Sequence, residues 1–247
     1  IYEFWFENKG DGDNIVKEAE QAGLAFLEAH PDKELGYYVI GTVKYNNGEF
    51  EEAQKYYLDA IARDSSSFMT WYQLVFTDLE LRKAEVTYDH ATKAMRYYPE
   101  QPIFHLLKGI SLLEMEKYED AIKMAESAMP LYVKLKNNSG FEDASFLAAQ
   151  SYFAINKYEE AENLCRSIVK VHEKRSTCFH IANVYSLLGL IYIKMQDLSR
   201  ATALFKQALN LEQCNERYSG AALDYANLAF IEKLAGRFDN ALLNFVK

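Results

Sequence analysis

Lys157-Tyr158-Glu159-Glu160-Ala161 is a short stretch that recurs, in varied form, along this 247-residue chain. Each copy has an aromatic residue or leucine, then two mostly polar residues, then alanine. The other copies are Gly48-Glu49-Phe50-Glu51-Glu52-Ala53, Lys117-Tyr118-Glu119-Asp120-Ala121, Asp197-Leu198-Ser199-Arg200-Ala201 and Gly236-Arg237-Phe238-Asp239-Asn240-Ala241. Because self-similarity at a fixed spacing marks a repeated structural unit, the chain is expected to be an array of equivalent units.

The spacing of the alanines sets the boundaries of these units. The last three steps are each 40 residues, and the first step of 68 residues is two steps of 34. A weaker copy of the stretch lies midway between Ala53 and Ala121, with Thr87 where alanine is expected. The pattern predicts one array over residues 1–247, made of a partial repeat 1–33, repeats of about 34–67, 68–101, 102–141, 142–181 and 182–221, and a partial repeat 222–247.

The repeated stretch resembles the turn and the start of the second helix in the tetratricopeptide repeat. This resemblance implies an all-α fold, a right-handed α-α superhelix of antiparallel helix hairpins. Some residues depart from the family pattern: Lys108 and Ala148 stand where leucine is usual, Lys44 and Asp78 where tyrosine is usual, and repeat 68–101 lacks the glycine of the turn. The 40-residue units have six more residues than the 34-residue units, so their helices or their turns must be longer. About three extra residues in each helix would add roughly one helical turn.

Small residues share one place on the first helix of the repeats. They are Gly41, Gly109, Ala149, Gly189 and Ala229. Glycine costs about 1 kcal/mol in a helix interior relative to alanine, so three glycines at equivalent places indicate that the second helix approaches closely there. Asn137-Asn138-Ser139-Gly140 is interpreted as a polar turn.

Composition excludes several classes of protein. The apolar content of 49% is enough to bury a core, and the net charge of −9 makes nucleic acid a poor partner, since phosphates repel an acidic surface. No apolar stretch approaches the roughly 20 residues of a membrane span. The chain has an odd number of cysteines, Cys165, Cys178 and Cys214, and no two of them have CxxC spacing. This favours buried free thiols over a disulfide framework.

Nothing in the sequence indicates catalysis. A Cys–His pair or metal site is conceivable where Cys178 and His180 are two apart and where Cys165 and His172 are seven apart. Ordinary helix and turn residues are the more economical interpretation, and no known catalytic or nucleotide-binding motif occurs. The prediction is a protein that is not an enzyme, with no metal site and no cofactor.

The family resemblance also implies where a partner would bind. In such arrays the first helices line the concave side, and the second, fifth, ninth and twelfth residues of each repeat face the groove. The candidate binding residues among these are Tyr38, Tyr45, Tyr72, Phe76, Leu106, Ile110, Phe146, Gln150, Phe153, Asn183, Leu190 and Phe230. The basic residues that clamp a terminal carboxylate in chaperone-binding arrays are absent here, which excludes that kind of groove.

The predicted groove is apolar and aromatic, so it favours an apolar or amphipathic segment of another protein, such as a helix. The alternative is that neighbouring first helices bury these side chains. The leading function is therefore a protein- or peptide-binding scaffold. A peptide-sensing regulatory part of a larger bacterial signalling or transcription-regulating protein is the second, and self-association through the apolar ends is another. The sequence leaves the compartment open, with the cytoplasm slightly favoured over the bacterial periplasm. The last residues, Phe245-Val246, do not resemble a polar capping helix, and the chain is expected to continue.

Overall fold

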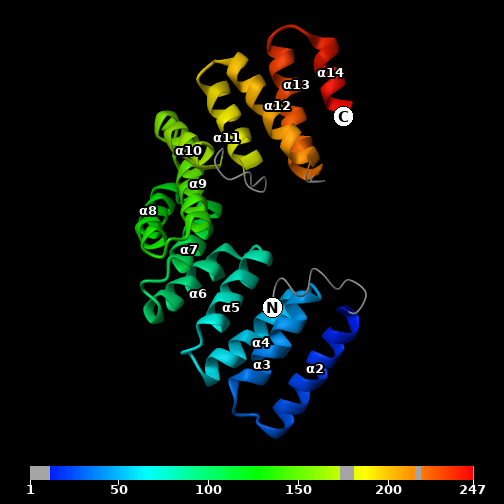
Figure 1. Cartoon of the computed structure of the whole chain (residues 1–247), viewed down its shortest axis with the longest axis vertical. Helices are drawn as coiled ribbons and strands as arrows, with labels where there is room; N and C mark the ends of the chain where they lie inside the picture. Colours follow the sequence, from blue (N-terminus) through cyan, green and yellow to red (C-terminus); the bar gives the residue numbers. More distant parts are fainter. Residues whose placement is uncertain (1–11, 173–180, 215–217, 247) are drawn as a thin grey trace. The chain divides into compact units, whose positions relative to one another are not determined.

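The computed structural model describes residues 12–172, 181–214 and 218–246 (Figure 1). Every regular element in these ranges is an α-helix, which confirms the all-α prediction. In chain order the helices are α2 Gly12–Ala29, α3 Glu34–Asn46, α4 Phe50–Arg63, α5 Phe68–Glu80, α6 Ala84–Tyr97, α7 Pro102–Glu114, α8 Tyr118–Lys134, α9 Asn138–Ala154, α10 Tyr158–His172, α11 Ile181–Lys194, α12 Leu198–Cys214, α13 Tyr218–Leu234 and α14 Phe238–Val246.

The chain divides into two compact units. Unit 1 is Ile1–Lys117, with α2 to α7, and unit 2 is Tyr118–Lys247, with α8 to α14. Within each unit a helix packs mainly on the helices next to it in the sequence. In unit 1 the pairs α3–α4 and α5–α6 form hairpins (Figure 1), and their first helices α3, α5 and α7 also contact one another in order. In unit 2 the first helices α9 and α11 are in contact in the same way.

Local signals explain where several helices begin. The Ser67 side chain accepts a hydrogen bond from the backbone N–H of Thr70 at 3.3 Å, which caps α5. Pro102 opens α7, where its missing N–H costs nothing. Asn137 caps α9 by accepting from the N–H of Gly140 at 2.9 Å. The polar-turn prediction at Asn137–Gly140 is therefore wrong beyond its first residue. An asparagine in a polar run is as good an N-cap as a turn former, and the sequence did not separate the two.

Several helices of the longer units are themselves longer, which is one of the two possibilities that the 40-residue spacing left open. Helices α3 to α7 have 13 or 14 residues, whereas α8, α9, α12 and α13 have 17 each. The added residues thus extend the hairpins along their own axes.

The turns between the two helices of a hairpin share one backbone conformation. One residue has a positive φ, and the next N–H bonds to a carbonyl five residues earlier, as between Glu49 N and Lys44 O at 2.9 Å. Gly48 takes this position in one turn at φ 78°, which suits a residue without Cβ. Arg82 takes it at φ 52°, and Lys83 N bonds to Asp78 O at 3.1 Å. Glu116, Asn156 and Gln196 take the same position in the next three hairpin turns. The turn therefore forms without glycine.

Close helix approach depends on the small residues, as predicted. A Cβ placed on Gly41 would lie 2.8 Å from the ring of Tyr57, and one on Gly189 would lie 2.6 Å from the ring of Phe205. Both rings are fully buried and cannot move aside. Gly109, Ala149 and Ala229 are buried as well. On the second helices the recurring alanines Ala53, Ala121, Ala161, Ala201 and Ala241 are all buried.

Candidate binding surface

The candidate surface of unit 1 is formed by one side of its three first helices. We call it the first-helix face of unit 1 and define it by the second, fifth, ninth and twelfth residues of each repeat. These residues are Leu35, Tyr38, Thr42 and Tyr45 on α3, Met69, Tyr72, Phe76 and Leu79 on α5, and Ile103, Leu106, Ile110 and Leu113 on α7. None of the twelve is charged.

Solvent reaches this face to different depths. Leu35 and Met69 are the most open, with 48% and 47% of their surface exposed. Of the predicted binding residues in unit 1, Tyr38, Tyr45, Tyr72, Phe76 and Ile110 are half-buried. Leu106 is only 5% exposed, so its side chain belongs to the core.

The half-buried aromatic rings contact one another across the helices. Tyr72 and Phe76 lie 5.9 Å apart between ring centroids on α5, and Phe76 lies 6.4 Å from Tyr45 on α3. Tyr38 lies 6.1 Å from the buried ring of Tyr57. All of these rings pack on the core of unit 1. The rings therefore form a fixed apolar surface, since ring pairs at these distances restrain each other. The side of each ring that is turned away from solvent packs on the core.

The first-helix residues of unit 2 are more mixed. Phe146 and Phe153 on α9 and Leu190 on α11 are half-buried and pack against the cores of that unit. Phe230 on α13 is 47% exposed. The polar candidates are Gln150, which is half-buried, and Asn183, which is exposed. Charged residues also stand at the second and twelfth places of repeats in unit 2, namely Asp143 on α9 and Lys233 on α13. This surface therefore lacks the uniform apolar character of the face of unit 1.

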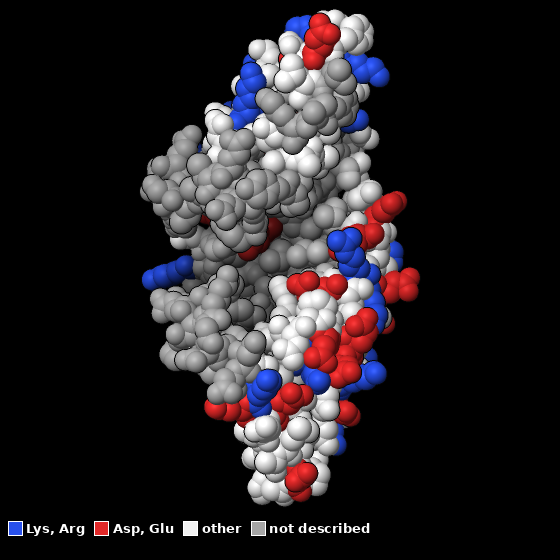
Figure 2. All heavy atoms as spheres, turned by 90° about the vertical axis from the view of Figure 1, so that its right-hand side faces the viewer, with Lys and Arg blue, Asp and Glu red and all other residues white. Residues whose placement is uncertain are grey.

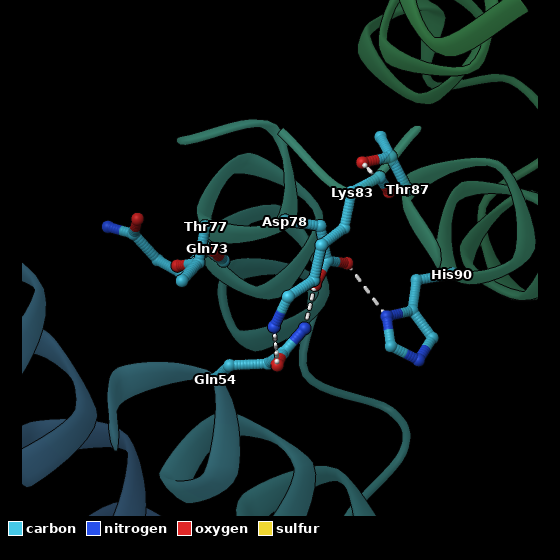
Figure 3. Close-up of polar contacts among 7 residues, drawn as sticks. All are labelled: Gln54, Gln73, Thr77, Asp78, Lys83, Thr87 and His90. Carbon is cyan, nitrogen blue, oxygen red and sulfur yellow. Dashed lines mark hydrogen bonds and ion pairs between the residues drawn. The ribbon is translucent and has the colours of Figure 1, made fainter. Parts of the chain in front are cut away.

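A polar contact between consecutive hairpins, centred on Asp78, was not predicted from the sequence (Figure 3). Asp78 on α5 is fully buried and accepts a short hydrogen bond from the amide of Gln54 on α4. Its other oxygen lies 2.7 Å from Nδ1 of His90 on α6. Lys83 donates to the Gln54 carbonyl oxygen at 3.3 Å. A buried carboxylate needs such partners to offset the cost of leaving water.

The same place of other repeats, the eleventh, makes comparable contacts with the preceding hairpin. Lys44 on α3 lies 3.4 Å from Glu20 on α2, and also 2.9 Å from Glu49. The hydrogen bond with Glu49 raises the pKa of Lys44 despite partial burial, so the ammonium stays charged. In unit 2 the Tyr192 hydroxyl on α11 donates to Glu162 on α10. Lys44 and Asp78, which depart from the family tyrosine, therefore belong to a row of contacts that links hairpins.

The conceivable catalytic groups have ordinary surroundings where the structure describes them. Cys165 on α10 is a free thiol with no exposed surface, and burial raises its pKa to about 12. A thiol with this pKa is protonated at neutral pH and is a poor nucleophile. Cys178 and His180, and the side chains of His172 and Cys214, lie outside the described residues.

The described ranges, residues 12–172, 181–214 and 218–246, also bear on metal binding and on membrane insertion. No three of their histidine, cysteine, aspartate and glutamate side chains gather closely enough to share a metal ion. None of their helices combines the length and the hydropathy that crossing a bilayer requires.

Comparison with known proteins agrees with the hairpin architecture. The sequence model of the tetratricopeptide repeat matches residues 36–67 and 182–213. No curated protein matches the chain.

Solved structures with the same fold include Cut9 in the APC/C hetero-tetramer Cut9–Hcn1, with a TM-score of 0.72 and 15% identity over 93% of this chain. The chain spans 42% of the length of that protein. PilW, a type IV pilus biogenesis factor, has a TM-score of 0.69 and 13% identity, covering 85% of this chain and 90% of its own. YrrB, a TPR protein with an unusual peptide-binding site, has a TM-score of 0.59 and 18% identity, covering 78% and 94%.

Proposed function

Because the chain is a tetratricopeptide-repeat protein, we propose that it is a scaffold that binds another polypeptide, and that the first-helix face of unit 1 holds this partner. The observation that carries the proposal is the uncharged row of twelve residues on α3, α5 and α7, with Leu35 and Met69 about half exposed. Exposed apolar residues that lie side by side on a rigid surface are typical of interaction sites. YrrB, which shares the fold, has a peptide-binding site.

The chemistry of the face indicates what it would bind. It offers aromatic and aliphatic side chains, so the partner must bring apolar groups of its own. A helical segment with one apolar side meets this need, since its anchors at every third or fourth residue can lie along the row of rings. The role of the protein is then to hold its partner, with no reaction of its own.

The candidates of unit 2 would extend the contact for a longer partner. Phe230 supplies exposed apolar surface there, and Asn183 supplies an exposed amide. We give these residues a secondary role because charged neighbours interrupt the apolar row.

A titration with a hydrophobic fluorescent dye and with an amphipathic helical peptide tests the proposal. Phe76→Asp is expected to reduce binding of both, because a charge would stand in the centre of the row. Leu58→Asp is the matched control, because Leu58 is 40% exposed and lies on the second helix α4. Equal loss in the two variants, or no binding by the unchanged protein, would refute the proposal.

A further inference from the structure

We infer that the partner of the first-helix face of unit 1 is a basic amphipathic helix, whose positive side chains meet Glu80 and Glu114. The inference rests on the proposed function and adds the charge of the partner. It follows from three observations: the position of these two glutamates, the contacts of the lysines on the same first helices, and the distribution of charge between the two units.

The first observation is the position of the acidic residues. Glu80 is the last residue of α5 and follows Phe76 by four residues, while Glu114 is the last residue of α7 and follows Ile110 by four. Residues four apart lie on the same side of a helix. Both glutamates are exposed, so each stands at the edge of the apolar row, beside a ring or aliphatic side chain of that row.

The second observation is that the lysines of these first helices are directed to other contacts. Lys44 makes ion pairs with Glu20, Glu49 and Glu52. Lys108 lies 4.5 Å over the ring of Tyr88 on α6. Neither lysine is therefore available to neutralise the edge of the face.

The third observation is the distribution of charge along the sequence. Residues 1–117 include 12 basic and 21 acidic residues, whereas residues 118–247 include 15 of each, so unit 1 carries the whole net charge. Figure 2 is turned about the vertical axis of Figure 1, so α2 to α6 lie in the lower half of both views. In that half of Figure 2, acidic side chains (red) outnumber basic ones (blue). The C-terminal ends of α5 and α7 add partial negative charge at the two glutamates. Together these charges favour a cationic partner.

The spacing between α5 and α7 sets the pattern on the partner. The two helices are in contact, and packed helices have axes about 8–10 Å apart. Seven residues of an α-helix span about 10 Å. A partner helix with two basic residues about seven positions apart, next to its apolar side, can therefore reach both glutamates.

The test uses the full chain and three designed helical peptides that share one apolar side. Their polar sides carry lysine, glutamine or glutamate. At low salt we expect the lysine peptide to bind about three- to tenfold more tightly than the glutamine peptide, the effect of two exposed ion pairs. The glutamate peptide should bind most weakly, and salt should reduce all these differences.

Variants separate local charge from the overall charge of the protein. Glu80→Lys with Glu114→Lys should remove the preference for the lysine peptide, whereas Asp59→Lys with Asp89→Lys should keep it. The control pair changes the net charge equally and lies on the second helices α4 and α6, at exposed positions.

The outcomes distinguish the two proposals. Equal binding of the three peptides, or a preference that survives the Glu80 and Glu114 changes, overturns this inference. If Phe76→Asp still reduces binding in that case, the proposed function stands. If no peptide binds, or if Phe76→Asp has no effect, the proposed function fails as well.

Discussion

Asp78 accepts a hydrogen bond from Gln54, which lies 24 residues earlier on the second helix of the preceding hairpin. Lys44 and Glu20 are also 24 residues apart and make an ion pair at the equivalent place. In unit 2 the corresponding pair, Tyr192 with Glu162, is 30 residues apart, because the unit there is six residues longer.

Each of these pairs joins complementary groups. A carboxylate lies opposite Lys44 and opposite Tyr192, and an amide lies opposite Asp78. Stacked hairpins gain stability from their neighbours, and these contacts fix how one hairpin meets the next.

Replacing Asp78 tests the energetic weight of this contact. Asp78→Ala is expected to lower the free energy of unfolding by about 2–3 kcal/mol, because Gln54 and His90 lose a buried partner. Asp89→Ala on exposed α6 surface should change it by less than about 0.5 kcal/mol. Urea denaturation followed by circular dichroism measures both. Equal stability of the two variants would show that the buried carboxylate contributes nothing.

A larger residue at Gly189 tests the close approach of α11 and α12. Gly189→Leu is expected to cost about 3 kcal/mol, because its side chain would overlap the buried ring of Phe205. Phe205→Ala alone is expected to cost about 3–5 kcal/mol, and combining the two changes should cost less than their sum, because the missing ring makes room for the leucine. A double variant that loses more stability than the two single variants lose together would contradict this packing.

The hairpin turns allow a test in which one substitution stabilises and its reverse destabilises. Gln196 has φ 64° between α11 and α12, so Gln196→Gly relieves a conformation that costs a side-chain residue about 1 kcal/mol. Part of this gain is lost to the greater freedom of glycine in the unfolded chain. The reverse change Gly48→Gln should destabilise by about 1 kcal/mol, because Gly48 has φ 78°. Melting temperatures that move in the same direction for both variants would argue against this account of the turns.

Burial of Cys165 predicts a pH dependence of stability. Its pKa rises from an ordinary value of 9.0 to about 12, with nearby Glu162 adding to the effect of burial. Above pH 9 the unfolded chain loses the thiol proton while the folded chain keeps it. The buried, protonated thiol therefore makes its full contribution to the free energy of unfolding below pH 9, and this contribution is lost as the pH rises from 9 to 12. The fall in stability over this range should be smaller in Cys165→Ala, and a parallel fall in both proteins would exclude the thiol as its source.

Much of the fold could be predicted from the sequence because the responsible residues recur. Gly41 and Gly189 stand at equivalent places, and the structure shows a buried ring against each of them. Helices begin at Glu34, Phe68 and Pro102, where three repeats were predicted to start, whereas α9 begins at Asn138 and α13 at Tyr218, four residues before the predicted 142 and 222. Such features depend on neighbours within one hairpin, which periodicity reveals.

Features that depend on a partner in another hairpin could not be predicted in this way. Asp78 was recognised as a departure from the family pattern, but its contacts with Gln54 and His90 require knowledge of which helices meet. Arg82 gives no sign of a left-handed turn in the sequence, because the surrounding hairpin imposes that conformation. Leu106 follows the spacing of the surface residues and is nevertheless buried, since helical spacing does not report depth.

Site-specific photocrosslinking tests most directly whether the first-helix face of unit 1 holds a polypeptide. A photoreactive residue replaces Met69 on α5 in one protein and Leu58 on α4 in another, two apolar residues of similar exposure at 47% and 40%. The account predicts that an amphipathic helical peptide is captured at position 69 and not at position 58. Capture at position 58 alone, or equal capture at both positions, would contradict it.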